Sequence, residues 1–277
     1  MQLTNADFQR LSQFIYDELG IKISTSKRTM LTGRLTRRLR ALKIATISEY
    51  CDFLFTPEGK QLEHIHLFDA ITTNKTDFFR EANHFDLLTE TLLAQWQAGL
   101  RENRKFTIWS AGCSSGEEPY TMAMVLDGYA QQVAQRSFDY DIIATDISIK
   151  VLDHAKKAVY HADRVKPVPA AMRNKYLLRN RDNGNPLVRI VPALRKKVRF
   201  GRVNFMDTSF AMPHKMDVIF CRNVIIYFDK KTQEQLMEKF CQNLQPGGYL
   251  FLGHSETIHG FDVPLTQIAP TVYHYRP

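Results

Sequence analysis

The chain has 277 residues, of which 44% are hydrophobic and 24% are charged, and these proportions exclude a mainly disordered or fibrous protein. No stretch approaches about 18 uninterrupted apolar residues, and the start lacks the basic head and apolar run of a secretory signal, so neither a membrane span nor secretion is predicted. The net charge of +8 indicates an anionic partner without naming its class.

The first seventy or so residues predict a helical unit, placed at residues 1–72. Apolar residues recur at helical spacing up to Leu19, and Gly20 follows as a natural stop. A second helix carries a leucine stripe. Two further apolar-periodic stretches follow, one ending at Pro57-Glu58-Gly59 and one running from Leu62 to Ile71. Basic residues without an intervening acid surround the second helix: Lys22, Lys27, Arg28, Arg34, Arg37, Arg38, Arg40 and Lys43.

From about Phe106 the pattern changes to strand, glycine turn and helix. Strands are predicted over 106–111, 140–146 and 216–221 and from Tyr249, with helices over 117–133, 148–157 and 230–244. Such alternation is typical of an α/β domain with a parallel sheet covered on both faces. We place this domain at residues 91–277, after a linker at 73–90.

One segment interrupts that alternation. Several prolines, the turn signal Asn183-Gly184-Asn185-Pro186 and two alternating runs, 187–191 and 198–203, predict a small antiparallel hairpin. We place this inserted β-subdomain at about residues 164–200.

The first strand leads into a glycine turn followed by an acidic pair. Gly112 and Gly116 let the backbone turn tightly, although a plain strand-to-helix turn explains them equally well. Glu117 and Glu118 then occupy the first helical turn. They either stabilise the helix dipole or attract a cationic ligand, an amine or a sulfonium, where a pyrophosphate would be repelled.

Polar residues also follow other predicted strands. Asp146 is placed to accept the ribose hydroxyls of a nucleoside, or else to cap the next helix. Arg222-Asn223 follows a buried strand and points to a ligand crevice at the strand ends. Tyr227 either lines a reaction channel or is a half-buried core aromatic. The stretch 73–80 has the composition of a binding wall, although composition alone favours a plain linker.

Four motifs, in the same order along the chain, resemble the chemotaxis receptor methyltransferase (CheR) family. They are Asn74-Lys75-Thr76-Asp77-Phe78-Phe79-Arg80-Glu81, then 109–120 around Gly112-Cys113-Ser114-Ser115-Gly116, then 221–229 around Arg222-Asn223, then Gly253-His254-Ser255-Glu256. The resemblance covers nearly the whole chain. It implies an N-terminal all-α domain joined to a Rossmann-like S-adenosylmethionine-dependent methyltransferase domain that carries a small inserted antiparallel β-subdomain.

The resemblance also implies a reaction and a set of residue roles. The reaction is methyl transfer from S-adenosylmethionine to glutamates of bacterial chemoreceptors, giving γ-methyl esters for adaptation and S-adenosylhomocysteine as product. Asn74, Thr76 and Arg80 would contact the cofactor from the linker. The remaining implied contacts are Glu117 to the methionyl amine, Asp146 to the ribose, Asn204 and Phe205 flanking the adenine, and Arg222 and Asn223 on the far side.

Residue chemistry agrees with that reaction. A sulfonium is an activated methyl donor, and a glutamate of reference pKa about 4.3 is a nucleophile at neutral pH, so no general base is needed. The catalytic assignments are therefore Arg80 and a channel-lining Tyr227. No metal site is predicted, because the four cysteines are scattered and indicate reduced thiols of a cytoplasmic protein: Cys51, Cys113, Cys221 and Cys241.

The basic helix predicts a docking surface for acidic receptor helices, formed by Arg34, Arg37, Arg38 and Arg40, although most charge runs are merely solvated. Reversing Arg37 and Arg38 to Glu should slow methylation without changing cofactor affinity. We expect a monomer that does not insert into the membrane and is recruited to membrane-bound receptor arrays. Whether the β-subdomain binds a receptor's C-terminal peptide stays open.

Two alternatives remain. A nucleic-acid methyltransferase would share the fold and explain the basic charge, but the sequence has no Asn/Asp-Pro-Pro-Tyr run and no Pro-Cys nucleophile, so we expect no nucleic-acid partner. A non-catalytic scaffold that binds cofactor and receptor would have no reason to keep all of Asn74, Arg80, Glu117, Asp146 and Asn223.

Overall fold

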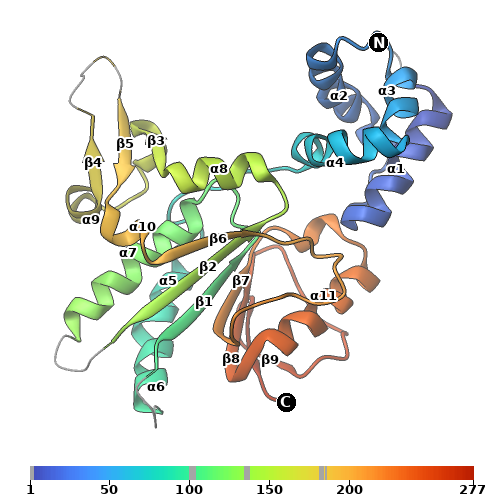
Figure 1. The fold of residues 1–277 in the computed structure, drawn as a ribbon. Helices are drawn as coiled ribbons and strands as arrows, with labels where there is room; N and C mark the ends of the chain where they lie inside the picture. The colour runs from blue at the N-terminus through green and yellow to red at the C-terminus, as the bar shows by residue number, and fades with distance from the viewer. Residues whose placement is uncertain (1–2, 100–103, 134–137, 181–183, 185) are drawn as a thin grey trace.

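The computed structural model describes residues 3–99, 104–133, 138–180, 184 and 186–277. It contains a helical N-terminal domain, a larger sheet domain and a small separate sheet, as Figure 1 shows. The α/β fold class with an all-α domain and an antiparallel insertion is confirmed.

The N-terminal domain consists of four α-helices around one apolar core. They are α1 (Asn5–Leu19), α2 (Arg28–Leu42), α3 (Ile47–Leu54) and α4 (Pro57–Ile71), with a 3₁₀ turn, η1, at Thr25–Lys27. Gly20 ends α1 in the left-handed conformation, with φ of 69°, as its position predicted. The leucine stripe of α2 is buried in the core.

The boundary predicted at Pro57-Glu58-Gly59 is wrong, because α4 begins there and not at Leu62. Proline is favourable in the first turn of a helix, where its missing N–H has no partner to lose. Thr56 caps α4 by accepting a hydrogen bond from the Gly59 amide at 2.9 Å.

The connecting segment is short. It runs to a continuous helical stretch, α5 (Asn83–Leu87), η2 (Leu88–Leu92, one π-helical turn) and α6 (Leu93–Ala98). Phe85, Leu88 and Leu92 are buried in the core of the sheet domain. Residues 83–90, which the sequence assigned to the linker, therefore pack as part of the sheet domain.

The central sheet has seven strands in the order β6-β2-β1-β7-β8-β10-β9. The parallel strands are β1 (Phe106–Ala111), β2 (Tyr140–Asp146), β6 (Val198–Arg202), β7 (Met216–Cys221) and β8 (Leu244–Leu252). The antiparallel strands are β9 (Leu265–Ala269) and β10 (Val272–Tyr275). The strand order reverses at β1, because β2 and β6 extend the sheet to one side of it and β7 and β8 to the other. Open α/β sheets bind ligands at the carboxyl ends of the strands at such a reversal.

Alternate residues of β1 enter two different cores, as a strand's period of two requires. Phe106 and Ile108 pack with α5 and α7 (Glu117–Gln132), whereas Trp109 packs with α11 (Lys230–Asn243) on the other face. The third long helix, α8 (Ile149–Lys157), contacts β2 and β6. The sheet is thus covered on both faces, as the strand-helix alternation predicted.

The insertion differs from the predicted hairpin. Its three-stranded antiparallel sheet has the order β3-β5-β4, from β3 (Val159–His161), β4 (Leu177–Arg179) and β5 (Leu187–Ile190), with η3 (Ala162–Val165), α9 (Ala170–Tyr176) and α10 (Pro192–Arg195) around it. The second predicted run, 198–203, forms β6, which pairs in parallel with β2. That pairing was wrong because alternation identifies a strand but not its partner. The predicted turn 183–186 lies partly outside the described residues.

Candidate active site

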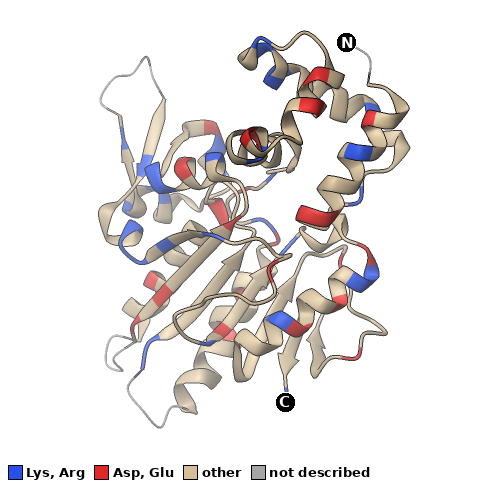
Figure 2. Cartoon of the chain, turned by 45° about the vertical axis from the view of Figure 1, so that its right-hand side comes forward, with Lys and Arg blue, Asp and Glu red and all other residues tan. Residues whose placement is uncertain are grey.

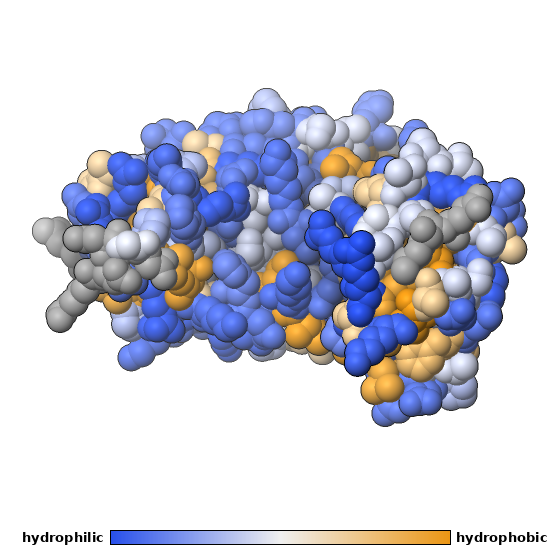
Figure 3. All heavy atoms as spheres, turned by 90° about the horizontal axis from the view of Figure 1, so that it is seen from above, coloured by the Kyte–Doolittle hydropathy of each residue, from blue (hydrophilic) through white to orange (hydrophobic). Residues whose placement is uncertain are grey.

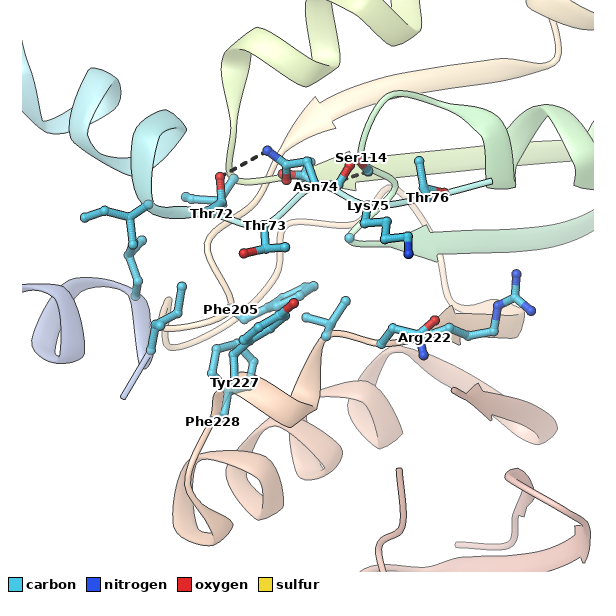
Figure 4. Close-up of a pocket in the computed structure, with 18 of the residues that line it drawn as sticks. Thr72, Thr73, Asn74, Lys75, Thr76, Ser114, Phe205, Arg222, Tyr227 and Phe228 are labelled. Carbon is cyan, nitrogen blue, oxygen red and sulfur yellow. Dashed lines mark hydrogen bonds between the residues drawn. The ribbon is translucent and has the colours of Figure 1, made fainter. Parts of the chain in front are cut away.

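A cavity lies where the linker crosses the carboxyl ends of β1, β2 and β7. It encloses about 1220 Å³ between atoms, counted to its open mouth. In Figure 4, Thr72 to Thr76 of the linker lie along one wall and Phe205, Tyr227 and Phe228 along the opposite wall, with Arg222 at one end. A pocket of this size, apolar on one side and polar on the other, suits a small-molecule ligand.

Eight of the nine predicted cofactor residues meet in this cavity, together with Tyr227. The eight are Asn74, Thr76, Arg80, Asp146, Asn204, Phe205, Arg222 and Asn223. Glu117 does not line it, and its neighbour Glu118 does. Residues predicted from four distant parts of the sequence thus converge on one site.

Asp146 ends β2 with a buried carboxylate that reaches two loops. Its Oδ2 accepts the Ser114 amide and its Oδ1 the Ser148 amide, each at 2.9 Å. Burial raises the pKa of this carboxyl above its usual range, although these amides oppose that shift. The helix cap itself is Ser148, which accepts from Val151. A carboxylate offers about four acceptor positions, so Asp146 can still accept ligand hydroxyls.

The turn after β1 needs its glycines. Gly112 has φ of 85°, and a Cβ there would approach Val224 Cγ2 to 2.7 Å. Gly116 has φ of 97°, and a Cβ there would approach the Tyr160 hydroxyl to 2.8 Å. Only glycine fits both positions without strain, so the backbone can pass close beneath the cavity.

The two carboxylates of the acidic pair point to different partners. Glu118 accepts Arg222 Nε at 2.8 Å and the Ser110 hydroxyl at 2.7 Å. Glu117 accepts Arg164 Nη2 at 2.7 Å and the Ser115 hydroxyl at 2.6 Å. Both are buried, so each negative charge has a specific partner.

Arg222 lines the cavity, but its guanidinium is already bound. Besides Glu118, Nη1 donates to the Arg80 carbonyl at 2.8 Å and to His84 Nδ1 at 3.3 Å. Burial and the Arg222 charge lower the pKa of His84 to about 4, so that ring is neutral. Arginine only donates, hence Nδ1 accepts and Nε2 carries the proton shared with Thr271, 3.1 Å away.

Sequence reasoning gave no role to Glu256, which holds the segment after β7. Its buried carboxylate accepts the amides of Gly253 at 2.6 Å, Asn223 at 2.8 Å and Ile226 at 3.4 Å. Burial raises the pKa of Glu256. These bonds fix the backbone between the cavity residues Asn223 and Tyr227. The Gly253-His254-Ser255-Glu256 motif was the sequence feature that could have drawn attention to Glu256.

The aromatic wall joins the two domains. The Tyr227 carbonyl accepts the Lys22 amide at 3.2 Å, and Lys27 Nζ lies 6.0 Å from the centre of the Tyr227 ring. Asn204 donates from Nδ2 to the Glu18 carbonyl at 2.7 Å. The N-terminal domain also supplies lining residues that the sequence did not assign to the site: Leu19, Ile21, Lys22, Ile23, Lys27, Met30 and Ile71. One wall of the cavity therefore belongs to the helical domain.

The four predicted docking arginines fall into two pairs. Arg34 donates to the carbonyls of Ile71 and Thr72, and Arg38 forms an ion pair with the buried Glu63. Arg37 and Arg40 are exposed. Figure 2 shows that acidic residues of other helices intersperse with the basic residues of this domain. The structure therefore leaves Arg37 and Arg40 as the pair presented to solvent.

Comparison with known proteins identifies the family. Residues 6–72 match the family model described as CheR methyltransferase, all-alpha domain, and residues 74–273 match CheR methyltransferase, SAM binding domain. The chain belongs to the CheR methyltransferase family. It is accordingly an S-adenosylmethionine-dependent chemotaxis protein methyltransferase, and S-adenosylmethionine is its cofactor.

Relatives match over nearly the whole chain. The chemotaxis protein methyltransferase of Borreliella burgdorferi is 40% identical over 99% of this chain and 95% of its own length. That of Escherichia coli is 35% identical over 99% and 92%. A solved structure of the glycopeptide N-methyltransferase MtfA with sinefungin is 13% identical, covers 80% of this chain and 70% of its own, and has a TM-score of 0.38.

The groups that line the cavity are compatible with this cofactor. The Asp146 carboxylate can accept hydroxyl donors, Phe205 offers an apolar face, and the Glu118 carboxylate also lines the cavity. Among the described residues, no helix has the length and apolar character needed to cross a membrane.

Proposed function

We propose that this protein methylates glutamate side chains of bacterial chemoreceptors, forming γ-methyl esters for adaptation. The carrying observation is the cavity, which combines the buried Asp146 carboxylate at the strand ends with Arg80 and the phenol of Tyr227 in its lining. Chemotaxis protein methyltransferase is also the name of relatives that match over the whole chain.

No residue of this chain would need to form a covalent bond or act as a general base in the reaction. The cofactor supplies an activated methyl group, and a receptor glutamate is already ionised at neutral pH. Asp146, Asn204 and Phe205 would hold the nucleoside, and Asn74 and Thr76 would close over it. Arg80 and Tyr227 would orient the incoming carboxylate and exclude water. Orientation of this kind can contribute on the order of 7 to 11 kcal/mol.

The methionyl amine would be held by the acidic pair. Glu118 lines the cavity, while Glu117 lies one residue away with its carboxylate bound by Arg164. The contact between Glu117 and the amine therefore stays a prediction. Each carboxylate is also paired with an arginine, so an amine in the cavity would have to share Glu118 with Arg222.

Receptor docking would use Arg37 and Arg40 of α2, since acidic helices are attracted to exposed cations. In Figure 3 the surface seen from above is mainly hydrophilic, and an apolar area gathers on the side of the N-terminal domain. The inserted sheet has β3 and β4 at its edges, where a receptor's C-terminal peptide would pair as an added strand. We infer a cytoplasmic monomer recruited to receptor arrays.

The first test is a calorimetric titration with S-adenosylmethionine and S-adenosylhomocysteine. Asp146→Ala should weaken binding at least about 100-fold, because charge-assisted hydrogen bonds to both ribose hydroxyls are lost. Asp153→Ala, an exposed carboxylate on α8, is the matched control and should bind normally. Equal affinity of Asp146→Ala and wild type would contradict the ribose assignment.

The second test identifies the acceptor. Tritiated methyl groups should enter receptor-bearing membranes and be released by mild base as methanol, which is diagnostic of a carboxyl methyl ester. Label transferred to DNA or RNA would favour a nucleic-acid methyltransferase. Cofactor binding without any transfer would favour a scaffold.

A further inference from the structure

The linker is strained on both sides of Arg80. Phe79 has φ of 54° and Glu81 has φ of 53°, and neither is a glycine. Non-glycine residues in the left-handed region cost of order 1–3 kcal/mol and persist only where surrounding contacts hold them. Something must therefore keep Arg80 presented to the cavity.

The Glu81 carboxylate makes the contacts that do so. Its Oε1 accepts the His254 amide at 3.2 Å and Asn223 Nδ2 at 3.4 Å, and its Oε2 lies 3.5 Å from Arg222 Nη1. The side chain is 10% exposed. These donors come from the ends of β7 and β8, so one carboxylate ties the linker to two strand ends.

Asn223 depends on the same contact. It too is left-handed, with φ of 59°, and a Cβ at Gly253 would approach its Nδ2 to 2.4 Å. The Asn223 side chain is thus confined between Gly253 and Glu81. Residues on both sides of the cavity, Arg80 and Asn223, are held through Glu81.

We propose that Glu81, which does not line the cavity, is a positioning residue that fixes Arg80 and Asn223 for cofactor binding and methyl transfer. This inference rests on the proposed function of the site. It gives a task to a carboxylate that the reaction itself does not use.

A metal site is the competing explanation. Glu81, His84 and His254 offer ligand atoms that all lie within 4.8 Å of one another. However, Arg222 Nη1 lies 3.3 Å from His84 Nδ1 and 3.5 Å from Glu81 Oε2. This fixed cation lies beside two of the three residues that would hold a metal ion, and it favours the positioning role.

The experiment compares two substitutions. Glu81→Gln keeps the shape, but whichever way the amide turns, its NH₂ faces a donor: Arg222, or Asn223 and the His254 amide. Glu81→Asn suits the left-handed backbone better yet is one methylene shorter. Glu90→Gln, an exposed glutamate in η2, is the matched control. Each variant is melted, titrated with S-adenosylhomocysteine and assayed with receptor membranes.

Both Glu81 variants should remain folded, bind S-adenosylhomocysteine about 10-fold more weakly and show a similarly raised KM for S-adenosylmethionine. The loss of cofactor affinity should exceed any rise in the KM for receptor, a split that a general loss of stability would not produce. Glu90→Gln should match wild type.

Three results separate the possibilities. If wild type binds no S-adenosylhomocysteine, the proposed function fails. If wild type binds and folded Glu81→Gln binds equally well, the positioning role alone is overturned. A rise in the melting temperature of wild type on adding Zn²⁺, absent in Glu81→Gln, would make the cluster a metal site and also overturn it.

Discussion

Two arginine-bearing regions of this molecule use charge in opposite ways. At the strand ends, Arg222 is 2% exposed in its side chain and every partner is another part of the chain. On α2, Arg37 and Arg40 face solvent, and between them Arg38 is tied to the buried Glu63. Arg37 and Arg38 are adjacent in sequence but lie in different environments, because successive residues of a helix point in different directions.

Burial, and not charge alone, decides what each of these arginines contributes. A buried ion pair is weak evidence for added stability, but removing one partner leaves an uncompensated charge and is strongly destabilising. An exposed arginine contributes little to stability and acts at longer range through association with partners. The predictions below test this contrast.

The largest effect is expected from Arg222→Met. This variant keeps the apolar stem and leaves the Glu118 carboxylate buried beside Ser110 alone, so the free energy of unfolding should fall by about 3–5 kcal/mol. Urea denaturation measures it. Adding Glu118→Gln to the same chain should recover part of the loss, because the stranded charge is removed. If the free energy of unfolding falls by less than about 1 kcal/mol, the ion pair between Arg222 and Glu118 is not needed for stability.

The next effect concerns pH and His84. Its folded pKa of about 4 lies below the ordinary 6.5, so between these values the unfolded chain binds a proton that folded His84 does not. Neutral His84 therefore contributes fully to the free energy of unfolding above pH 6.5. As the pH falls from 6.5 to 4, the free energy of unfolding decreases by about 3 kcal/mol. Urea unfolding over this range should show a weaker pH dependence in His84→Gln.

The matched control for His84 is His66→Gln on α4, where the ring is exposed. That variant should keep the pH dependence of wild type. Identical profiles for His84→Gln and wild type would mean that the ring is not held neutral by Arg222 and burial.

The smallest effects on stability are expected on α2, and they separate its two pairs. Arg38→Ala leaves Glu63 with only the Tyr50 hydroxyl, 3.3 Å away, and should cost about 1–3 kcal/mol in unfolding free energy. Arg37→Ala should stay within about 0.5 kcal/mol.

Receptor methylation should respond in the opposite order. Reversing Arg37 and Arg40 to Glu should raise the KM for receptor several-fold at low salt and less at high salt, with cofactor affinity unchanged. The reversal of Arg37 and Arg38 suggested by the sequence would also break the ion pair between Arg38 and Glu63, so Arg37 and Arg40 are the better test. If cofactor affinity falls together with the receptor KM effect, α2 is not a docking surface.

Much of the fold could be predicted because its signals are local. Periodicity identified α1 and α2, and the buried runs 106–111, 140–146 and 216–221 identified β1, β2 and β7 with their bounds. The wrong predictions concerned which strands pair. The β6 sequence alternates like a hairpin strand, but β6 pairs in parallel with β2 at the edge of the main sheet. Alternation says that one face is buried and not which strand lies alongside.

The candidate site divides in the same way. Asp146 and Arg222-Asn223 follow strands that end at one edge of a parallel sheet, so the sequence brought them together correctly. Of the acidic pair, only Glu118 lines the cavity, a distinction that depends on the direction of each side chain from the first turn of α7.

By itself, the sequence determined α1, α2 and the main parallel strands, the two-domain plan and the strand-end residues of the cavity, because each depends on spacing within one segment. The tertiary structure alone decided that helical-domain residues form one wall and that Arg34 and Arg38 are held within the chain. It also decided that Glu81 and Glu256 accept hydrogen bonds from the segments that follow β7 and β8. Those facts are contacts between segments far apart in the chain, and no local pattern encodes which buried charge will meet which donor.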